Sequence, residues 1–156
     1  MNTLVVYYSR TGRTKKLAED IKNSLTCDIE EIFDTVKRSG PFGYLRSGRQ
    51  AMKETLTVLK DSKRDLSLYD LIIIGTPVWT NSLSTPVRTY LHQNKDRFNK
   101  VAFFCSYGGS GFENTFSQME ELCKKKPVGV LAVEAMDVLK ENYADKLKKF
   151  VDDIQK

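Results

Sequence analysis

Four short, continuous apolar runs most constrain what this chain can fold into. They are Leu4–Tyr8, Leu71–Ile74, Val101–Cys105 and Val128–Val133, and each is rich in β-branched or aromatic residues. A strand that is covered on both faces is apolar at every position, whereas a strand with one solvated face alternates. The runs therefore predict buried parallel strands. The weaker, more alternating segment Cys27–Ile32 predicts an edge strand.

Between these runs the apolar residues recur at helical spacing. Thr85-Pro86 has the form of an N-cap followed by a first-turn proline, and it predicts a helix through about Phe98. Three apolar stripes predict further helices, namely Leu17, Ile21 and Leu25; Phe116, Met119, Leu122 and Cys123; and Tyr143, Leu147, Phe150, Val151 and Ile154. The alternation predicts an α/β fold, an open five-stranded parallel sheet with five helices on both faces.

The segment Val36–Ser67 has the least regular pattern, because it contains several glycines and a proline before any helical period begins. We expect a crossover helix from about Ser47 to Lys60, preceded by a long loop. No linker or repeat divides the chain, so the 156 residues predict a single domain over 1–156.

Composition excludes several classes of function. Three cysteines without a C-x-x-C pair and a single histidine, His92, argue against a disulfide framework and a metal site. The net charge is +5, but no module that interleaves aromatic and basic residues is present, so we expect no nucleic-acid partner. No apolar run has the length of a signal peptide core or a membrane span, which predicts a cytoplasmic protein with no membrane partner.

In an open parallel sheet, ligands bind beyond the carboxyl ends of the strands. The first strand is followed by Ser9, Arg10, Thr11, Gly12, Arg13 and Thr14, which lead into a helix. Hydroxyls, a glycine and a helix N-terminus suit a phosphate monoester, because free backbone N–H groups and the helix dipole favour an anion there. The same features also occur in an ordinary N-cap loop.

Two further segments follow the third and fourth predicted strands. The first offers the only tryptophan of the chain among polar residues, and its candidate ligand-binding residues are Thr76, Pro77, Val78, Trp79, Thr80 and Asn81. The second is rich in glycine, so its backbone can approach a ligand closely, and its candidates are Ser106, Tyr107, Gly108, Gly109 and Gly111. An aromatic face and nearby backbone groups suit a flat ring with a polar edge.

No catalytic residue is predicted. Cys105 lacks the arginine of a C-x5-R phosphatase loop, because Gly111 stands in that position. The first loop lacks the acidic cluster of a response-regulator receiver. One histidine, distant from these loops in the sequence, leaves no Ser-His-Asp triad.

The segment Tyr8–Thr14 resembles the flavodoxin phosphate loop, [ST]-x-T-G-x-T, and the two later loops extend the resemblance over essentially the whole chain. The resemblance implies the strand order 2-1-3-4-5 and FMN as cofactor. It implies that Ser9, Thr11, Gly12 and Thr14 hold the FMN phosphate, with Arg10 and Arg13 at variable positions, and that Trp79 and Tyr107 lie against the flavin ring.

The resemblance leaves two functions open. One is an electron carrier that serves redox partner proteins or a small electron acceptor. The alternative is an FMN-dependent NAD(P)H:quinone-type oxidoreductase. The short chain favours the carrier, whereas the basic charge departs from the acidic character usual among flavodoxins that act as carriers. The oligomeric state, monomer or homodimer, stays open, as does the role of residues 37–64, which can cover the flavin or form a dimer contact.

Overall fold

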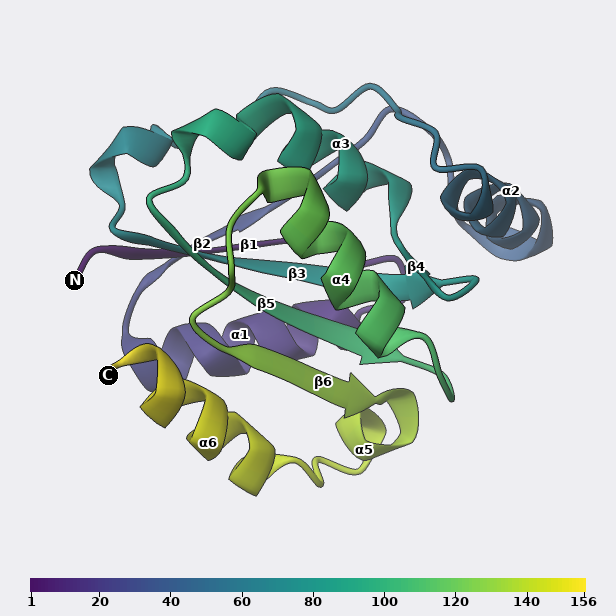
Figure 1. Cartoon of the computed structure of the whole chain (residues 1–156). Helices are drawn as coiled ribbons and strands as arrows, with labels where there is room; N and C mark the ends of the chain where they lie inside the picture. The colour runs from purple at the N-terminus through teal and green to yellow at the C-terminus, as the bar shows by residue number, and fades with distance from the viewer.

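The computed structural model describes residues 1–156 and contains one parallel sheet in the order β2-β1-β3-β5-β6 (Figure 1). Counted along the chain, these five strands have the order 2-1-3-4-5, which confirms the predicted fold. A sixth, two-residue strand, β4, was not expected and pairs antiparallel with the end of β3. The strands are β1 (Thr3–Tyr7), β2 (Asp28–Glu31), β3 (Leu71–Trp79), β4 (Ser82–Leu83), β5 (Lys100–Tyr107) and β6 (Val130–Glu134).

Helices cover both faces of the sheet (Figure 1). One face carries α1 (Arg13–Leu25) and α6 (Ala144–Ile154), and the other carries α3 (Thr85–Asn94) and α4 (Phe112–Cys123). A short extra helix, α5 (Ala135–Leu139), follows β6. Two 3₁₀ turns, η1 (Leu66–Leu68) and η2 (Lys95–Arg97), complete the chain. No helix is both long and apolar enough to cross a membrane.

The continuous apolar runs divide their side chains between two cores. Leu4 and Val6 of β1 pack on the side of α3 and α4. Val5 and Tyr7 of the same strand pack on the side of α1 and α6. Successive side chains of a strand point to opposite faces, so a strand between two helical layers must be apolar at every position.

Helix α2 spans Gly40–Met52, so the expected helix over Ser47–Lys60 was wrong in its bounds. Ser39 in extended conformation and Pro41 in the first turn set an early start, because proline is favoured there. Glu54 has a left-handed backbone (φ 55°) and follows the end of the helix. The next residues run extended beside the segment after β2, where the Lys60 N–H donates to the Phe33 carbonyl (2.7 Å).

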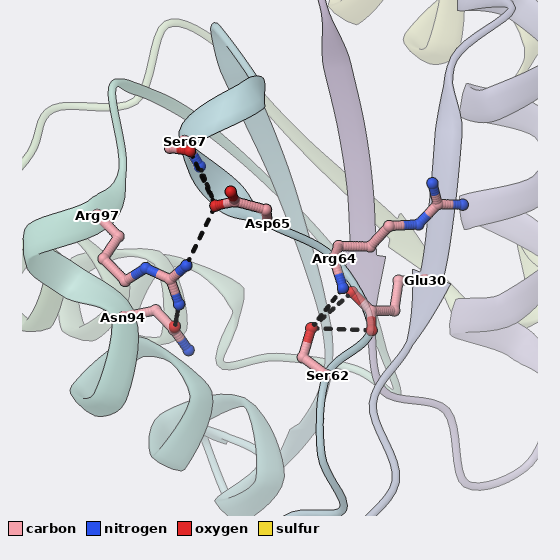
Figure 2. A network of polar contacts seen from close by, with 7 residues as sticks. All are labelled: Glu30, Ser62, Arg64, Asp65, Ser67, Asn94 and Arg97. Atoms are coloured by element: carbon pink, nitrogen blue, oxygen red, sulfur yellow. Dashed lines mark hydrogen bonds and ion pairs between the residues drawn. The ribbon is translucent and has the colours of Figure 1, made fainter.

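Polar contacts hold the long connection from α2 to β3 against its neighbours (Figure 2). Ser62 donates to the Glu30 carboxylate of β2 (2.9 Å). Asp65 accepts from the Ser67 amide and hydroxyl and pairs with Arg97 of η2 (3.5 Å). These contacts fasten the connection beside the sheet.

Candidate functional site

The predicted loops meet at the carboxyl end of the sheet around a hollow of about 180 Å³. Because β1, β3 and β5 are adjacent and parallel, the segments that follow them reach the same edge. Ten of the predicted residues line the hollow, together with Tyr44 of α2 and Ala135 of α5. The ten are Arg10, Thr11, Arg13, Thr14, Pro77, Val78, Trp79, Ser106, Tyr107 and Gly108.

The first loop forms the N-terminus of α1. Gly12 is the N-cap with a left-handed backbone (φ 95°), a conformation that favours glycine, and its N–H donates to the Ser9 hydroxyl (3.0 Å). The first helical hydrogen bond runs from the Lys16 N–H to the Gly12 carbonyl, so the intervening amides have no partner within the helix. The first turn contains no acidic residue. This end of α1 therefore suits an anion.

The second segment lies mostly within a strand, because β3 continues through Trp79 instead of ending near Ile74. Pairing with β5 extends as far as Pro77 opposite Ser106. A turn at Thr80 and Asn81, both with positive φ, then reverses the chain into β4. The strand directs Trp79 to the hollow, whereas Thr80 and Asn81 lie outside its lining.

Thr76 also lies outside the lining, since its side chain is fully buried. Its hydroxyl bonds the Ser84 hydroxyl (3.0 Å) and accepts from the Ser84 amide (3.0 Å). These hydrogen bonds connect the end of β3 with the N-terminus of α3.

Trp79 is 6% exposed and is surrounded by aromatic and cationic groups. The Tyr8 ring packs edge-on against the Trp79 ring, with centroids 5.5 Å apart. Burial raises the pKa of Tyr8 to about 12. The Arg38 guanidinium lies 5.3 Å from the indole centroid and the Arg10 guanidinium 5.9 Å from it. Arg10 also lies 4.9 Å from the Tyr44 ring, so its planar group contacts both aromatic side chains.

Two buried atoms of these arginines have no hydrogen-bond partner, namely Arg10 Nε and Arg38 Nη2. The other two guanidinium nitrogens of Arg38 are hydrogen-bonded. Its Nε donates to Asp34 (2.7 Å) and its Nη1 donates to the Ser47 hydroxyl (3.3 Å). Unpartnered buried donors are uncommon in proteins. Arg10 lines the hollow, so its Nε is an unpaired donor at that site, whereas Arg38 lies outside the lining.

The third segment begins inside β5, which runs through Tyr107. The Ser106 hydroxyl bonds the buried Thr14 hydroxyl (2.8 Å) and thereby ties the third loop to the first. Tyr107 is half-buried and packs on Phe112 with ring centroids 4.9 Å apart. Gly109 and Gly111 lie outside the lining. Gly111, at φ 98°, is the N-cap of α4, and a Cβ there would meet Asn81 Oδ1 at 2.6 Å.

Sequence reasoning did not assign Tyr44 or Arg38 to the site. Tyr44 lies in the segment whose role was left open, and the structure places its ring beside Arg10. An aromatic residue in a glycine-rich segment was the available signal. Nothing in the sequence pattern indicated Arg38, because its position over Trp79 depends on how α2 and the preceding turn pack.

The thiols do not form a reactive centre. Cys105 is fully buried, and burial raises its pKa well above the ordinary value. No group of three or more His, Cys, Asp or Glu side chains is arranged to hold a metal ion. A larger hollow, of about 550 Å³, lies at the opposite, amino end of the strands near Met1 and Cys27. The smaller hollow is the candidate functional site, because a helix end that suits an anion and several aromatic side chains converge there.

A family model described as flavodoxin matches residues 2–154. The chain belongs to the flavodoxin family. No curated protein sequence matches it. Among solved structures, a flavoprotein in complex with FMN from Lactobacillus acidophilus is 26% identical, with a TM-score of 0.74 over 96% of this chain and 98% of that chain.

Two more distant flavodoxin structures share the fold. Oxidised flavodoxin 1 from Bacillus cereus is 16% identical, with a TM-score of 0.56 over 99% of this chain and 98% of that one. A WrbA-like flavodoxin from Agrobacterium tumefaciens is 14% identical, with a TM-score of 0.59 over the same shares. The flavodoxin fold predicted from the sequence is thus confirmed.

Proposed function

We propose that this flavodoxin binds FMN in the hollow at the carboxyl end of the sheet and serves as an electron-transfer protein. The observation that carries the proposal is the convergence of an anion-binding helix end with aromatic side chains around one hollow. FMN, when bound, supplies the capacity to accept and release electrons, whereas the protein sets its affinity, exposure and potential.

The first loop fits the phosphate group. Thr11, Arg13 and Thr14 all line the hollow, and they lie at the N-terminal end of α1, where amides have no partner within the helix. Thr11 is exposed and forms no hydrogen bond within the chain, so its hydroxyl is free to donate. A phosphate dianion gains from each of these groups through charge-assisted hydrogen bonds and the helix dipole.

The other lining residues offer the kind of surface on which a flat ring packs. Trp79, Tyr107 and Tyr44 supply aromatic surface, and Pro77 and Val78 supply apolar contacts from β3. Arg10 of the first loop places its guanidinium over the Tyr44 and Trp79 rings, and its buried Nε has no hydrogen-bond partner. The residues present therefore match both the anionic and the aromatic parts of FMN.

Identifying the bound flavin tests the proposal. Protein purified under native conditions, or reconstituted from the apo form, should release FMN on denaturation, and chromatography of the released flavin identifies it. Release of FAD, or an apo protein that does not bind added FMN, would refute the proposed function.

Anaerobic mixing of the FMN-loaded protein with NADH or NADPH separates the carrier from the oxidoreductase. A carrier should keep its flavin absorbance until a reductase protein is added. Rapid bleaching by the nucleotide alone would instead establish the NAD(P)H-dependent oxidoreductase.

A further inference from the structure

Helix α2 carries its large apolar side chains on the side that faces away from the protein. Phe42, Leu45 and Met52 are 86%, 60% and 63% exposed. The buried residues of the helix are Gly43, Ser47 and Ala51, which recur every four residues and form a small-residue face toward the body of the protein. A helix that only covers a core has the opposite arrangement. The large apolar side chains of α2 are therefore free to contact a surface outside this chain.

Basic side chains lie among these apolar residues. At 100° per residue, Arg46, Arg49 and Lys53 lie on the same outward side as Phe42, Leu45 and Met52. All of these six residues except Met52 line one open hollow. We call these six residues the α2 outer face. No acidic residue occurs from Gly40 to Lys53.

The three basic side chains form no ion pair within the chain. The α2 outer face is thus both apolar and positively charged.

We propose that the α2 outer face binds an anionic lipid surface, with Phe42, Leu45 and Met52 entering the boundary between headgroups and acyl chains. Helices that bind membranes in this way combine apolar side chains with lysines and arginines. The long stems of Arg46, Arg49 and Lys53 let their charged heads remain at the level of the headgroups. The expectation of no membrane partner rested on the absence of a spanning segment, which binding at the surface does not require.

The observations favour a lipid surface over a protein partner. A second copy docked by two-fold symmetry would bring two sets of three unpaired cations together, which like-charge repulsion opposes. A helix of 13 residues offers a strip only about 20 Å long. Such a strip is small beside a standard protein interface of roughly 800 Å² per partner. A lipid surface demands no complementary shape and supplies the negative charge.

The position of α2 connects this surface with the flavin site. Tyr44 extends from the same helix to line the site hollow. Figure 1 shows α2 beside the carboxyl ends of β1 and β3, far from both termini. Binding through the α2 outer face would therefore hold the site close to the lipid. The proposal goes beyond the flavin proposal and does not depend on it.

Vesicle co-sedimentation at low salt tests the proposal, with apo and FMN-loaded protein measured separately. Both forms should bind mixed phosphatidylglycerol and phosphatidylcholine vesicles but not pure phosphatidylcholine vesicles. Added salt should weaken the binding. The double variant Arg46→Gln, Arg49→Gln should reduce the partition coefficient on the order of tenfold or more. Leu45→Ser should reduce it about fivefold or more.

Matched variants at other exposed positions serve as controls. Leu68→Ser removes a leucine that is 66% exposed, close to the 60% of Leu45, but on η1. Lys63→Gln combined with Lys100→Gln removes the same charge as the arginine pair, from residues outside α2. Circular dichroism should show that all variants fold. Equal losses in the control pair would overturn the proposal, because net charge alone would then explain binding.

Two further results would also overturn it. One is failure of the wild-type protein to bind the anionic vesicles at low salt. The other is a concentration-dependent dimer in analytical ultracentrifugation that Leu45→Ser abolishes, since the α2 outer face would then be a contact between copies.

Discussion

The hydroxyl-bearing residues of the first loop have different roles in the structure. Ser9 accepts from the Gly12 amide and so shapes the loop. Thr14 is buried and bonds Ser106 of the third loop. Thr11 is exposed and has no partner within the chain, which makes it the side chain of this loop best placed to bind a phosphate directly.

Thr11→Val should weaken FMN binding roughly ten- to a hundredfold, because a hydrogen bond to a charged group contributes about 1.5–3 kcal/mol. Titration of the apo protein with FMN measures the change. Riboflavin lacks the phosphate and should bind the variant as it binds the wild type. A loss of the same size for both ligands would show that Thr11 acts on the fold instead.

Trp79 permits a direct test of the ring position, because it is the only tryptophan in the chain. Its ring borders the site hollow, so bound FMN should quench its fluorescence almost completely. Adding FMN to the apo protein while recording tryptophan emission measures this. Bound flavin with unchanged emission would place the flavin ring away from Trp79.

At the scale of an element, α2 depends on close contact through its small residues. A Cβ on Gly43 would lie 2.3 Å from the Arg38 carbonyl carbon, so any side chain there must displace the backbone. A Cβ on Gly48 would meet only the Thr80 Oγ1 at 3.0 Å. A side chain is therefore excluded at Gly43 but can be accommodated at Gly48 of the same helix.

Gly43→Ala should lower the free energy of unfolding by about 1–3 kcal/mol, the usual cost of overpacking. Gly48→Ala, the matched control, should change it little or raise it by up to about 1 kcal/mol, because alanine is the better helix former. Urea unfolding of both variants measures the difference. Equal effects at the two positions would contradict the close packing of α2 on the Arg38 backbone.

For the whole molecule, two buried phenols and one half-buried thiol link stability to alkaline pH. Burial is the main cause that raises the pKa of Cys27 from 9.0 to about 11 and the pKa values of Tyr8 and Tyr143 from 10.0 to about 12. Each group stays neutral in the folded state at pH values where it ionises in the unfolded chain. The stabilisation is therefore complete below the unfolded pKa and is lost as the pH rises toward the folded pKa.

The free energy of unfolding should accordingly decline as the pH rises from about 8 to about 11. Urea unfolding across that range measures the decline. Cys27→Ser should lose less stability over the first part of the range, since it lacks the group with the lowest of these pKa values. A stability that rises with pH would contradict the burial of these side chains.

The sequence by itself determined the fold and the place of the candidate site. Continuous apolar runs such as Leu71–Ile74 require a sheet covered on both faces, and the parallel arrangement brings the following segments to one edge. The motif Ser9–Thr14 added the N-terminal end of α1, which suits an anion. These features can be predicted from local patterns, because apolar periodicity, the backbone freedom of glycine and helix N-terminal signals each involve only a few neighbouring residues.

Only the tertiary structure decided which side chains meet across the site and which helix face stays outside. Strand pairing carried β3 through Trp79, since β5 pairs with it as far as Pro77 and β4 pairs with Val78 and Trp79. Contacts between segments distant in sequence also set the bounds of α2. They bring Tyr44 to Arg10 and bury Arg38 over Trp79. Such contacts are selected by packing and by the pairing of buried polar groups, and no local pattern encodes them.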